Sequence, residues 1–230
     1  MGTTTAGPPA TGISVAPLRE TVRGQLLIAG DEGYDEARAV HNGMFDKRPL
    51  AVLRAEQVAD VIAAVNFARD NGLDLSIRDG GHSAPGFGTN DGGLVIDMSP
   101  MHSVHVDPGN KTARADAGTT WGDFNHATHA FGLATTGGII STTGVTGLTL
   151  GGGIGYLTRG CGLSIDNLIS ADVVTAEGRF VTASADENED LFWGLRGGGG
   201  NFGVVTSLEF RLHEVEIGRA SCRERVCLAV

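Results

Sequence analysis

The sequence predicts an α+β fold in which helices pack on largely antiparallel sheets. Three patterns support this class. Residues 51–78 place a helical apolar repeat between two short apolar strands, residues 104–115 and 168–183 alternate around turn residues, and residues 204–212 form a long alternating strand. A chain of 230 residues can bury a substantial core as one domain or as two small subdomains.

The N-terminal half is expected to open with a Gly-, Thr- and Pro-rich flexible leader and a short capping helix over residues 1–48, which carry little chemistry. Ala51–Leu53 then predicts a strand, and a helix follows that Gly72 ends. The apolar helix positions are Val58, Val61, Ile62, Val65 and Ala68. Leu75–Arg78 and Gly93–Asp97 predict two more strands, which completes a βαβ unit.

The second half begins with a predicted hairpin, in which residues 104–107 and 112–115 flank a Pro-Gly-Asn turn. Thr120 and Asp123 resemble a capping box and predict the start of a helix. The side chains that this helix presents to the core are Trp121, Phe124, Thr128 and Phe131. Glycine loops continue to Gly162, and a hairpin over residues 168–183 and a strand at 204–212 follow.

Composition and charge exclude several functional classes. The formal net charge of −10, without a basic patch, argues against nucleic acid as a partner. No apolar run reaches the length that crosses a bilayer, and no signal peptide is recognisable, so we expect a soluble, cytoplasmic protein without a membrane partner. Three cysteines make a disulfide framework improbable. The histidine pair 102/105 lies in a turn that enters a predicted strand, and the pair 126/129 lacks acidic or cysteine partners at ligand spacing, so no metal is expected.

The most informative segment is the loop Arg78–Ser83, which reads Arg-Asp-Gly-Gly-His-Ser and follows a predicted strand. Its two glycines allow successive N–H groups to point into one concavity, which is how a loop binds phosphate without lysines. His82 would stand beside the bound group as a nucleophile, base or ligand. The alternative is an ordinary glycine turn with a solvated histidine.

Two further glycine clusters, Gly147–Gly155 and Arg196–Gly203, lie between apolar segments. Such clusters imply close backbone approach to a large ligand, although a β-rich domain with tight turns would also use them. Gly198, Gly200 and Gly203 satisfy G-x-G-x-x-G, but a strand pattern follows where a Rossmann fingerprint needs a helix.

Together these motifs resemble the FAD-binding domain of berberine bridge enzyme-like flavoproteins, which belong to the vanillyl-alcohol oxidase group with a p-cresol methylhydroxylase-type FAD domain. The resemblance runs from about Arg48 to Leu212. It implies a two-subdomain FAD-binding domain at 48–213, with subdomains at about 48–102 and 103–213 and with residues 1–47 as leader and capping segment. The segments that carry it are Ile77–Ser83, Gly93–Asp97, Gly147–Gly155, Gly162–Asn167 and Leu191–Gly203.

The resemblance also implies the roles of individual residues. Arg78–Ser83 would bind the diphosphate of FAD, and His82 would bond to the 8α-methyl carbon of the flavin. Ile140 stands where some relatives carry a second flavin-linking cysteine, and Cys161 lies too far along the chain to replace it, so a single covalent link is implied. The full set of implied cofactor-binding residues is Arg78, Asp79, Gly80, Gly81, His82, Ser83, Gly138, Gly147, Gly151, Gly152, Gly153, Gly155 and Val205.

Members of this family continue into a substrate domain, which is missing here, and residues 214–230 match no part of the family, so we expect truncation and a non-native tail. No catalytic base can be assigned. The resemblance implies an FAD-linked oxidoreductase that transfers hydride from a small-molecule alcohol, sugar or amine to FAD, with molecular oxygen or another acceptor. The alternatives are a flavin-binding module without turnover and a misfolding fragment with exposed apolar surface.

Overall fold

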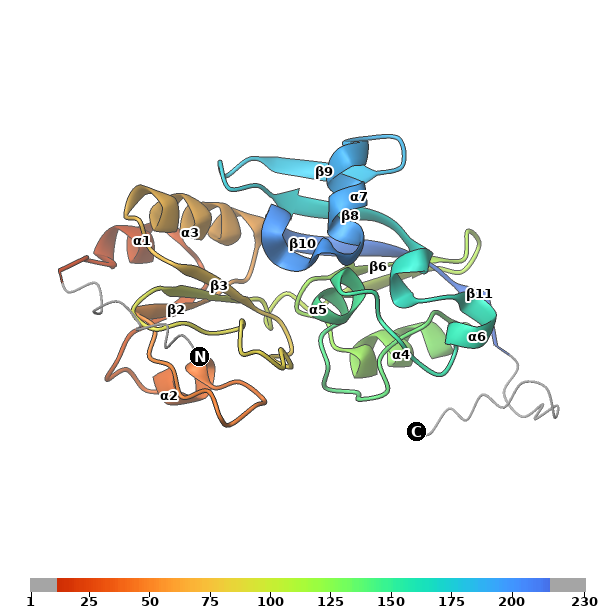
Figure 1. Ribbon diagram of the computed structural model, residues 1–230, viewed down its shortest axis with the longest axis horizontal. Helices are drawn as coiled ribbons and strands as arrows, with labels where there is room; N and C mark the ends of the chain where they lie inside the picture. Colours follow the sequence, from red (N-terminus) through yellow and green to blue (C-terminus); the bar gives the residue numbers. More distant parts are fainter. Residues whose placement is uncertain (1–11, 216–230) are drawn as a thin grey trace, which may run out of the picture.

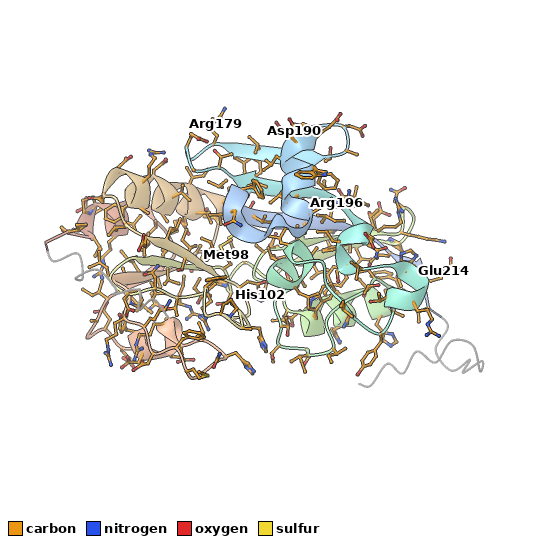
Figure 2. All side chains as sticks on the ribbon, viewed as in Figure 1. Met98, His102, Arg179, Asp190, Arg196 and Glu214 are labelled. Atoms are coloured by element: carbon orange, nitrogen blue, oxygen red, sulfur yellow. The ribbon has the colours of Figure 1, made fainter. Side chains whose placement is uncertain are left out.

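The computed structural model describes residues 12–215, which form two lobes side by side, each built on its own sheet (Figure 1). The first lobe takes its strands from residues 25–97, and the second lobe takes the strands of its main sheet from residues 104–211. The chain passes between them after Met98, which is buried in the core of the first lobe; Figure 2 shows Met98 and His102 at this passage.

The sheet of the first lobe has the strand order β1-β2-β4-β3. Its strands are β1 (Gln25–Leu27), β2 (Ala51–Arg54), β3 (Leu75–Arg78) and β4 (Leu94–Asp97). β4 runs parallel to both β2 and β3, and only β1 is antiparallel to its neighbour. The predicted βαβ unit is therefore confirmed, because the crossover through helix α3 (Val58–Asp70) returns the chain in the same direction. The broader expectation of largely antiparallel sheets is wrong for this lobe.

Helices cover both faces of this sheet, which explains why its central strands are continuously apolar. Ala51 and Leu53 of β2 pack towards α3 and α1 (Ala16–Thr21), whereas Val52 packs towards α2 (Tyr34–Arg38). Figure 1 shows α3 and α2 on opposite sides of the strands. As expected, α3 ends before Gly72, whose φ of +62° a residue with a side chain rarely adopts.

Residues 12–50 hold α1, β1 and α2, which is more than the single capping helix expected there. The expected flexible leader falls mainly on residues 1–11, which lie outside the described residues. The carboxylate of Asp60 in α3 accepts the backbone N–H groups of Arg23 at 2.9 Å and Gly24 at 3.1 Å. A Cβ on Gly24 would overlap the carbonyl oxygen of Arg54, so the backbone just before β1 lies close to the end of β2. Elements of three to six residues are too short to show a hydrophobic period, which is why the sequence pattern missed them.

The main sheet of the second lobe is antiparallel throughout, with the strand order β5-β6-β10-β8-β9. Its strands are β5 (Val104–Asp107), β6 (Thr112–Asp116), β8 (Leu168–Val174), β9 (Phe180–Ser184) and β10 (Val204–Arg211). Both predicted hairpins are confirmed. β10 is the central strand and is buried along most of its length, so the expected alternation is absent. Ser207 of β10 is buried although it is polar, because it forms hydrogen bonds with Arg114 and Asp172, which also bond to each other on that face of the sheet.

The opposite face of this sheet carries the core of the second lobe. Helix α4 (Trp121–His129) begins as predicted at Thr120, whose Oγ1 accepts the N–H of Asp123 at 3.3 Å. Trp121 and Phe124 are fully buried and form an aromatic cluster with Phe210 of β10. Phe131 was expected in the same stripe, but the helix ends at His129 and the Phe131 side chain is 51% exposed.

The remaining elements of the second lobe surround this core. They are β7 (Leu133–Ala134), which pairs with β11 (His213–Glu214), together with α5 (Val145–Leu150), α6 (Thr158–Cys161), α7 (Glu189–Gly198) and two short 3-10 turns at Ser164–Asn167 and Gly199–Phe202. β10 directly follows the glycine cluster Arg196–Gly203. A strand was expected there, whereas a Rossmann fingerprint would be followed by a helix. The expected atypical tail begins inside β11 at Glu214, and residues 216–230 lie outside the described residues. Within residues 12–215, no helix is long and apolar enough to cross a bilayer.

Candidate functional site

The loop Arg78–Ser83 leaves the carboxyl end of β3 and turns towards the second lobe. Gly81 has a φ of +71°, so it requires glycine as the sequence suggested, whereas Gly80 does not have positive φ. A Cβ on Gly80 would instead overlap the backbone of Gly144. Gly80 is therefore needed because the backbones of the two lobes touch at this point. We call the contact between residues 79–82 and residues 142–147 the lobe junction.

His82 is half-buried at the lobe junction, and two residues hold its imidazole. Its Nε2 atom lies 3.0 Å from Oγ1 of Thr142. Its ring stacks on the ring of His41, with centroids 4.0 Å apart and planes inclined by 16°. Burial, together with the neighbouring His41 imidazole, lowers the pKa of His82 below its usual range. The imidazole is therefore neutral and able to act as a nucleophile near neutral pH.

His41 lies within residues 1–48, where the sequence indicated little chemistry, yet its ring contacts the ring of His82. The backbone N–H of His41 donates to the carbonyl oxygen of Gly81 at 3.1 Å, which ties the segment between α2 and β2 to the His82 loop. Thr142 was missed as well. No periodicity or motif marks either residue, because their positions depend on contacts between segments distant in the sequence.

Asp79 joins the two lobes through its carboxylate. Oδ2 accepts the backbone N–H groups of Thr146 at 3.2 Å and Gly147 at 3.3 Å. Oδ1 is buried and has no hydrogen-bond partner among the described residues. Burial raises the pKa of Asp79 to about 7, although the N–H groups of Gly147, Thr146 and Gly80 oppose the increase. A Cβ on Gly144 would overlap this carboxylate, so glycine is required there.

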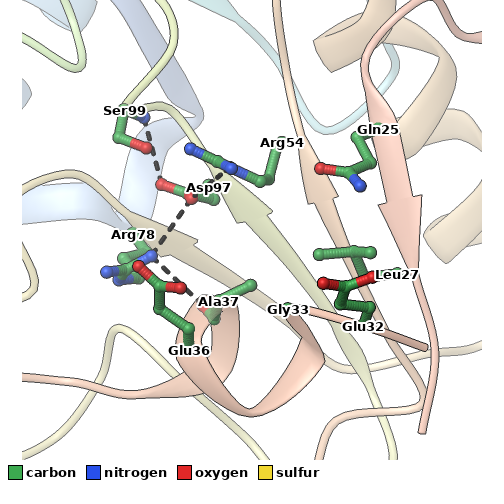
Figure 3. Close-up of a pocket in the computed structure, with 10 residues that line it drawn as sticks. All are labelled: Gln25, Leu27, Glu32, Gly33, Glu36, Ala37, Arg54, Arg78, Asp97 and Ser99. Atoms are coloured by element: carbon green, nitrogen blue, oxygen red, sulfur yellow. Dashed lines mark hydrogen bonds and ion pairs between the residues drawn. The ribbon is translucent and has the colours of Figure 1, made fainter. Parts of the chain in front are cut away.

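Arg78 interacts mainly with groups of its own lobe. Its Nη1 donates to Oδ2 of the buried Asp97 and to the carbonyl oxygen of Ala37, each at 3.1 Å (Figure 3). Asp97 also faces Arg54 at 3.5 Å and accepts the N–H of Ser99 at 3.0 Å. Nε of Arg78 is buried and has no hydrogen-bond partner in the part of the chain that the structure describes. Arg78 thus braces the start of the loop.

A cavity of about 560 Å³ adjoins Arg78 at the carboxyl ends of the parallel strands (Figure 3). Its wall includes the paired Arg54, Arg78 and Asp97 and the two further carboxylates of Glu32 and Glu36. None of Gly80–Ser83 lines it. The excess of carboxylates makes this cavity an unfavourable place for a diphosphate.

The cluster Gly147–Gly155 extends from the lobe junction along α5 and beyond it. At Gly147 a Cβ would meet no atom within 4 Å, so its backbone borders open space. Gly152 and Gly153 have positive φ, of +111° and +79°. A Cβ on Gly155 would overlap the carbonyl oxygen of Gly137, next to the predicted site residue Gly138, so two predicted segments meet there.

The other predicted positions differ in their surroundings. Gly138 packs on Trp121 and Leu148, and Gly151 forms the C-terminal cap of α5. Val205 has a buried side chain. At this position β10 pairs only with β8, because its pairing with β6 begins at Ser207. Ile140, the position without a second linking cysteine, is 51% exposed. Among residues 12–215, no cluster of His, Cys, Asp and Glu could hold a metal.

Comparison with known proteins identifies the family. Residues 49–184 match the family described as an FAD binding domain. The chain belongs to this FAD-binding family, and the proteins it is similar to include FAD-linked oxidoreductases and a berberine bridge enzyme-like protein. It is similar to the solved structure of 6-hydroxy-D-nicotine oxidase from Arthrobacter nicotinovorans, with 40% identity and a TM-score of 0.85 over 88% of this chain and 44% of that one.

Two other solved structures show the same relationship. A berberine bridge enzyme-like protein of Physcomitrella patens has 32% identity and a TM-score of 0.83, over 88% of this chain and 45% of that one. A chitooligosaccharide oxidase has 35% identity and a TM-score of 0.80, over 85% and 42%. These likenesses confirm the predicted α+β, p-cresol methylhydroxylase-type FAD-binding fold. The chain spans 43% of the length of two curated relatives that it matches, (R)-6-hydroxynicotine oxidase of Paenarthrobacter nicotinovorans and an FAD-linked oxidoreductase of Dictyostelium discoideum.

Proposed function

We propose that this flavoprotein-family chain binds FAD at the lobe junction, with the loop Arg78–Ser83 at the diphosphate and His82 bonded to the 8α-carbon of the flavin. The observation that carries the proposal is the imidazole of His82, half-buried at the junction, with one ring nitrogen held by Thr142 and one ring face held by His41. A histidine held in this way is oriented before the cofactor arrives, which lowers the entropic cost of forming a bond.

Several features of the surrounding backbone fit a large anionic ligand. Gly147 borders open space, Gly81 turns the loop through a left-handed conformation, and Nε of Arg78 is a buried donor without a partner among the described residues. With a net charge of −10, the protein would attract a diphosphate through local N–H groups and not through its overall charge. Ser83 and main-chain groups of Gly138, Gly151–Gly155 and Val205 would complete the contacts.

Bound FAD would supply an acceptor for hydride from a substrate carbon, with molecular oxygen or another compound taking up the electrons. A small-molecule alcohol, sugar or amine is the proposed substrate class, supported by relatives named as oxidases of 6-hydroxynicotine and of chitooligosaccharides. In this proposal the chain holds the cofactor. His82 would form the covalent bond to the flavin ring, and Thr142 and His41 would keep the His82 imidazole in place.

The covalent link can be tested by denaturing the purified chain and viewing the gel band under ultraviolet light. We expect flavin fluorescence in the wild-type band and none after His82→Ala, because that variant lacks the imidazole that would bond to the flavin. His105→Ala is the matched control, since His105 is exposed on β5 in the second lobe. A wild-type band without fluorescence, after incubation with excess FAD, would contradict the covalent link.

A second candidate is a flavin-binding module without turnover of its own. This candidate predicts yellow protein that dithionite reduces but that produces no hydrogen peroxide with any alcohol, sugar or amine. Peroxide formation with one such substrate, lost in His82→Ala, would instead support the oxidase.

A further inference from the structure

His41 and His82 form a face-to-face imidazole pair. Their centroids lie 4.0 Å apart with 16° between planes, and they come from different segments, one before β2 and one after β3. Two protonated imidazoles at this distance would repel each other strongly at a partly buried site. The pair therefore favours a state with at most one charge.

The contact is anchored on both sides. On the His41 side, its own backbone N–H donates to the carbonyl oxygen of Gly81, the residue next to His82. On the other side, Oγ1 of Thr142 lies 3.0 Å from Nε2 of His82. The His82 ring is thus limited in rotation by one neighbour at its edge and another at its face. An exposed histidine would have neither restraint.

We propose that His41 is a positioning residue for covalent attachment of FAD at His82, because it fixes the plane of that imidazole and opposes a second charge beside its own. This inference rests on the proposed function. His41 itself forms no bond to the cofactor. Its effect is exerted on the orientation and the charge of its neighbour.

The other charged groups near His82 are directed elsewhere. The guanidinium of Arg78 binds Asp97 and the carbonyl oxygen of Ala37. The carboxylate of Asp79 faces the N–H groups of Thr146 and Gly147. Thr142, which approaches from the second lobe, does not titrate. The pKa of His82 is lowered by burial first and by His41 second, in agreement with this arrangement.

The attachment step balances with dioxygen as oxidant. An unprotonated ring nitrogen of His82 bonds to the 8α-carbon, one C–H bond of that methyl group breaks, and the imidazole loses its N–H proton. The flavin takes up the two electrons, and dioxygen then accepts them with the two protons to give hydrogen peroxide. The step requires a neutral imidazole, since a protonated one has no lone pair to donate.

The test measures the rate of covalent incorporation when the apoprotein of the full chain is mixed with FAD, followed by in-gel fluorescence over a series of pH values. His41→Phe keeps a flat ring without a titratable group, His41→Ala removes both, and His105→Ala is the control. We expect His41→Ala to be slower by about tenfold or more, because loss of orientation is costly. In both His41 variants the midpoint of the pH profile should move to higher pH, while His41→Phe keeps more of the maximal rate.

An NMR titration of the wild-type apoprotein gives an independent readout. The His82 resonance should titrate below the usual value of 6.5, and a midpoint at or above it would overturn the proposal even if neither variant folds. Wild-type rates and midpoints in both variants would also overturn the role of His41, while leaving the covalent link intact. A wild-type chain that never acquires covalent flavin would contradict the proposed function itself.

Discussion

Oδ2 of Asp79 accepts a hydrogen bond from the backbone N–H of Thr146 at 3.2 Å, so one carboxylate connects the loop after β3 to the first turn of α5. Gly147 donates to the same oxygen at 3.3 Å. The two lobes are thereby held together within a few residues of His82. Changes at this contact should affect both stability and cofactor binding.

Asp79 should make the stability of the apoprotein depend on pH. Its folded-state pKa is about 7, above its ordinary value of 3.8, so the folded chain keeps a proton that the unfolded chain has lost. The free energy of unfolding should therefore fall as pH rises from about 4 to about 7 and change little above that. Urea unfolding across this range measures the slope. Asp79→Asn should reduce it, because an amide keeps an acceptor for Thr146 without titrating; an unchanged slope would contradict the assignment.

Gly147→Ala and Gly144→Ala form a matched pair that separates folding from cofactor binding. A Cβ at Gly147 meets no atom, so the free energy of unfolding of the apoprotein should hold or rise by about 0.5–1 kcal/mol. FAD affinity should fall if the cofactor approaches this backbone. A Cβ at Gly144 overlaps the carboxylate of Asp79, so that variant should lose about 1–3 kcal/mol. Calorimetric titration with FAD and urea unfolding measure the two effects, and undiminished FAD affinity in Gly147→Ala would remove Gly147 from the site.

The aromatic cluster of the second lobe should dominate its stability. Phe124→Ala removes a fully buried ring that contacts Trp121 and Phe210, and should cost about 3–5 kcal/mol. Phe131→Ala is the comparison, because that ring is half exposed and should change stability by no more than about 0.5 kcal/mol. Thermal unfolding followed by near-ultraviolet circular dichroism distinguishes the two, and equal losses would place Phe131 in the core after all.

The sequence predicted the elements that carry a long or clear period. The helix at Val58–Asp70, both hairpins and the capped start of α4 agree with their patterns. It did not predict α1 or β1, since short elements show little periodicity, whereas the βαβ pattern correctly implied the parallel direction of β2, β3 and β4. It placed Phe131 in the core because it extended the helical stripe beyond His129, where the helix ends.

Prediction of the site was similarly uneven. The motif singled out His82 and the two glycines before it as candidate site residues; the positive φ of Gly81 and the close backbone contact at Gly80 explain why glycines stand there. It could not identify His41 or Thr142, because both are distant from His82 in the sequence. They contact His82 only in the folded chain. It also attributed Gly80 to ligand binding alone, whereas the structure gives it a contact with the backbone of Gly144.

The central place of β10 has a consequence for biosynthesis. This strand is the last of its sheet to leave the ribosome, yet it lies between β6 and β8. Until Arg211 has emerged, the β5–β6 and β8–β9 hairpins have no common neighbour, whereas every strand of the other lobe is already available by Asp97. The nascent protein should therefore acquire its N-terminal half early and expose two unjoined hairpin edges until translation has passed β10.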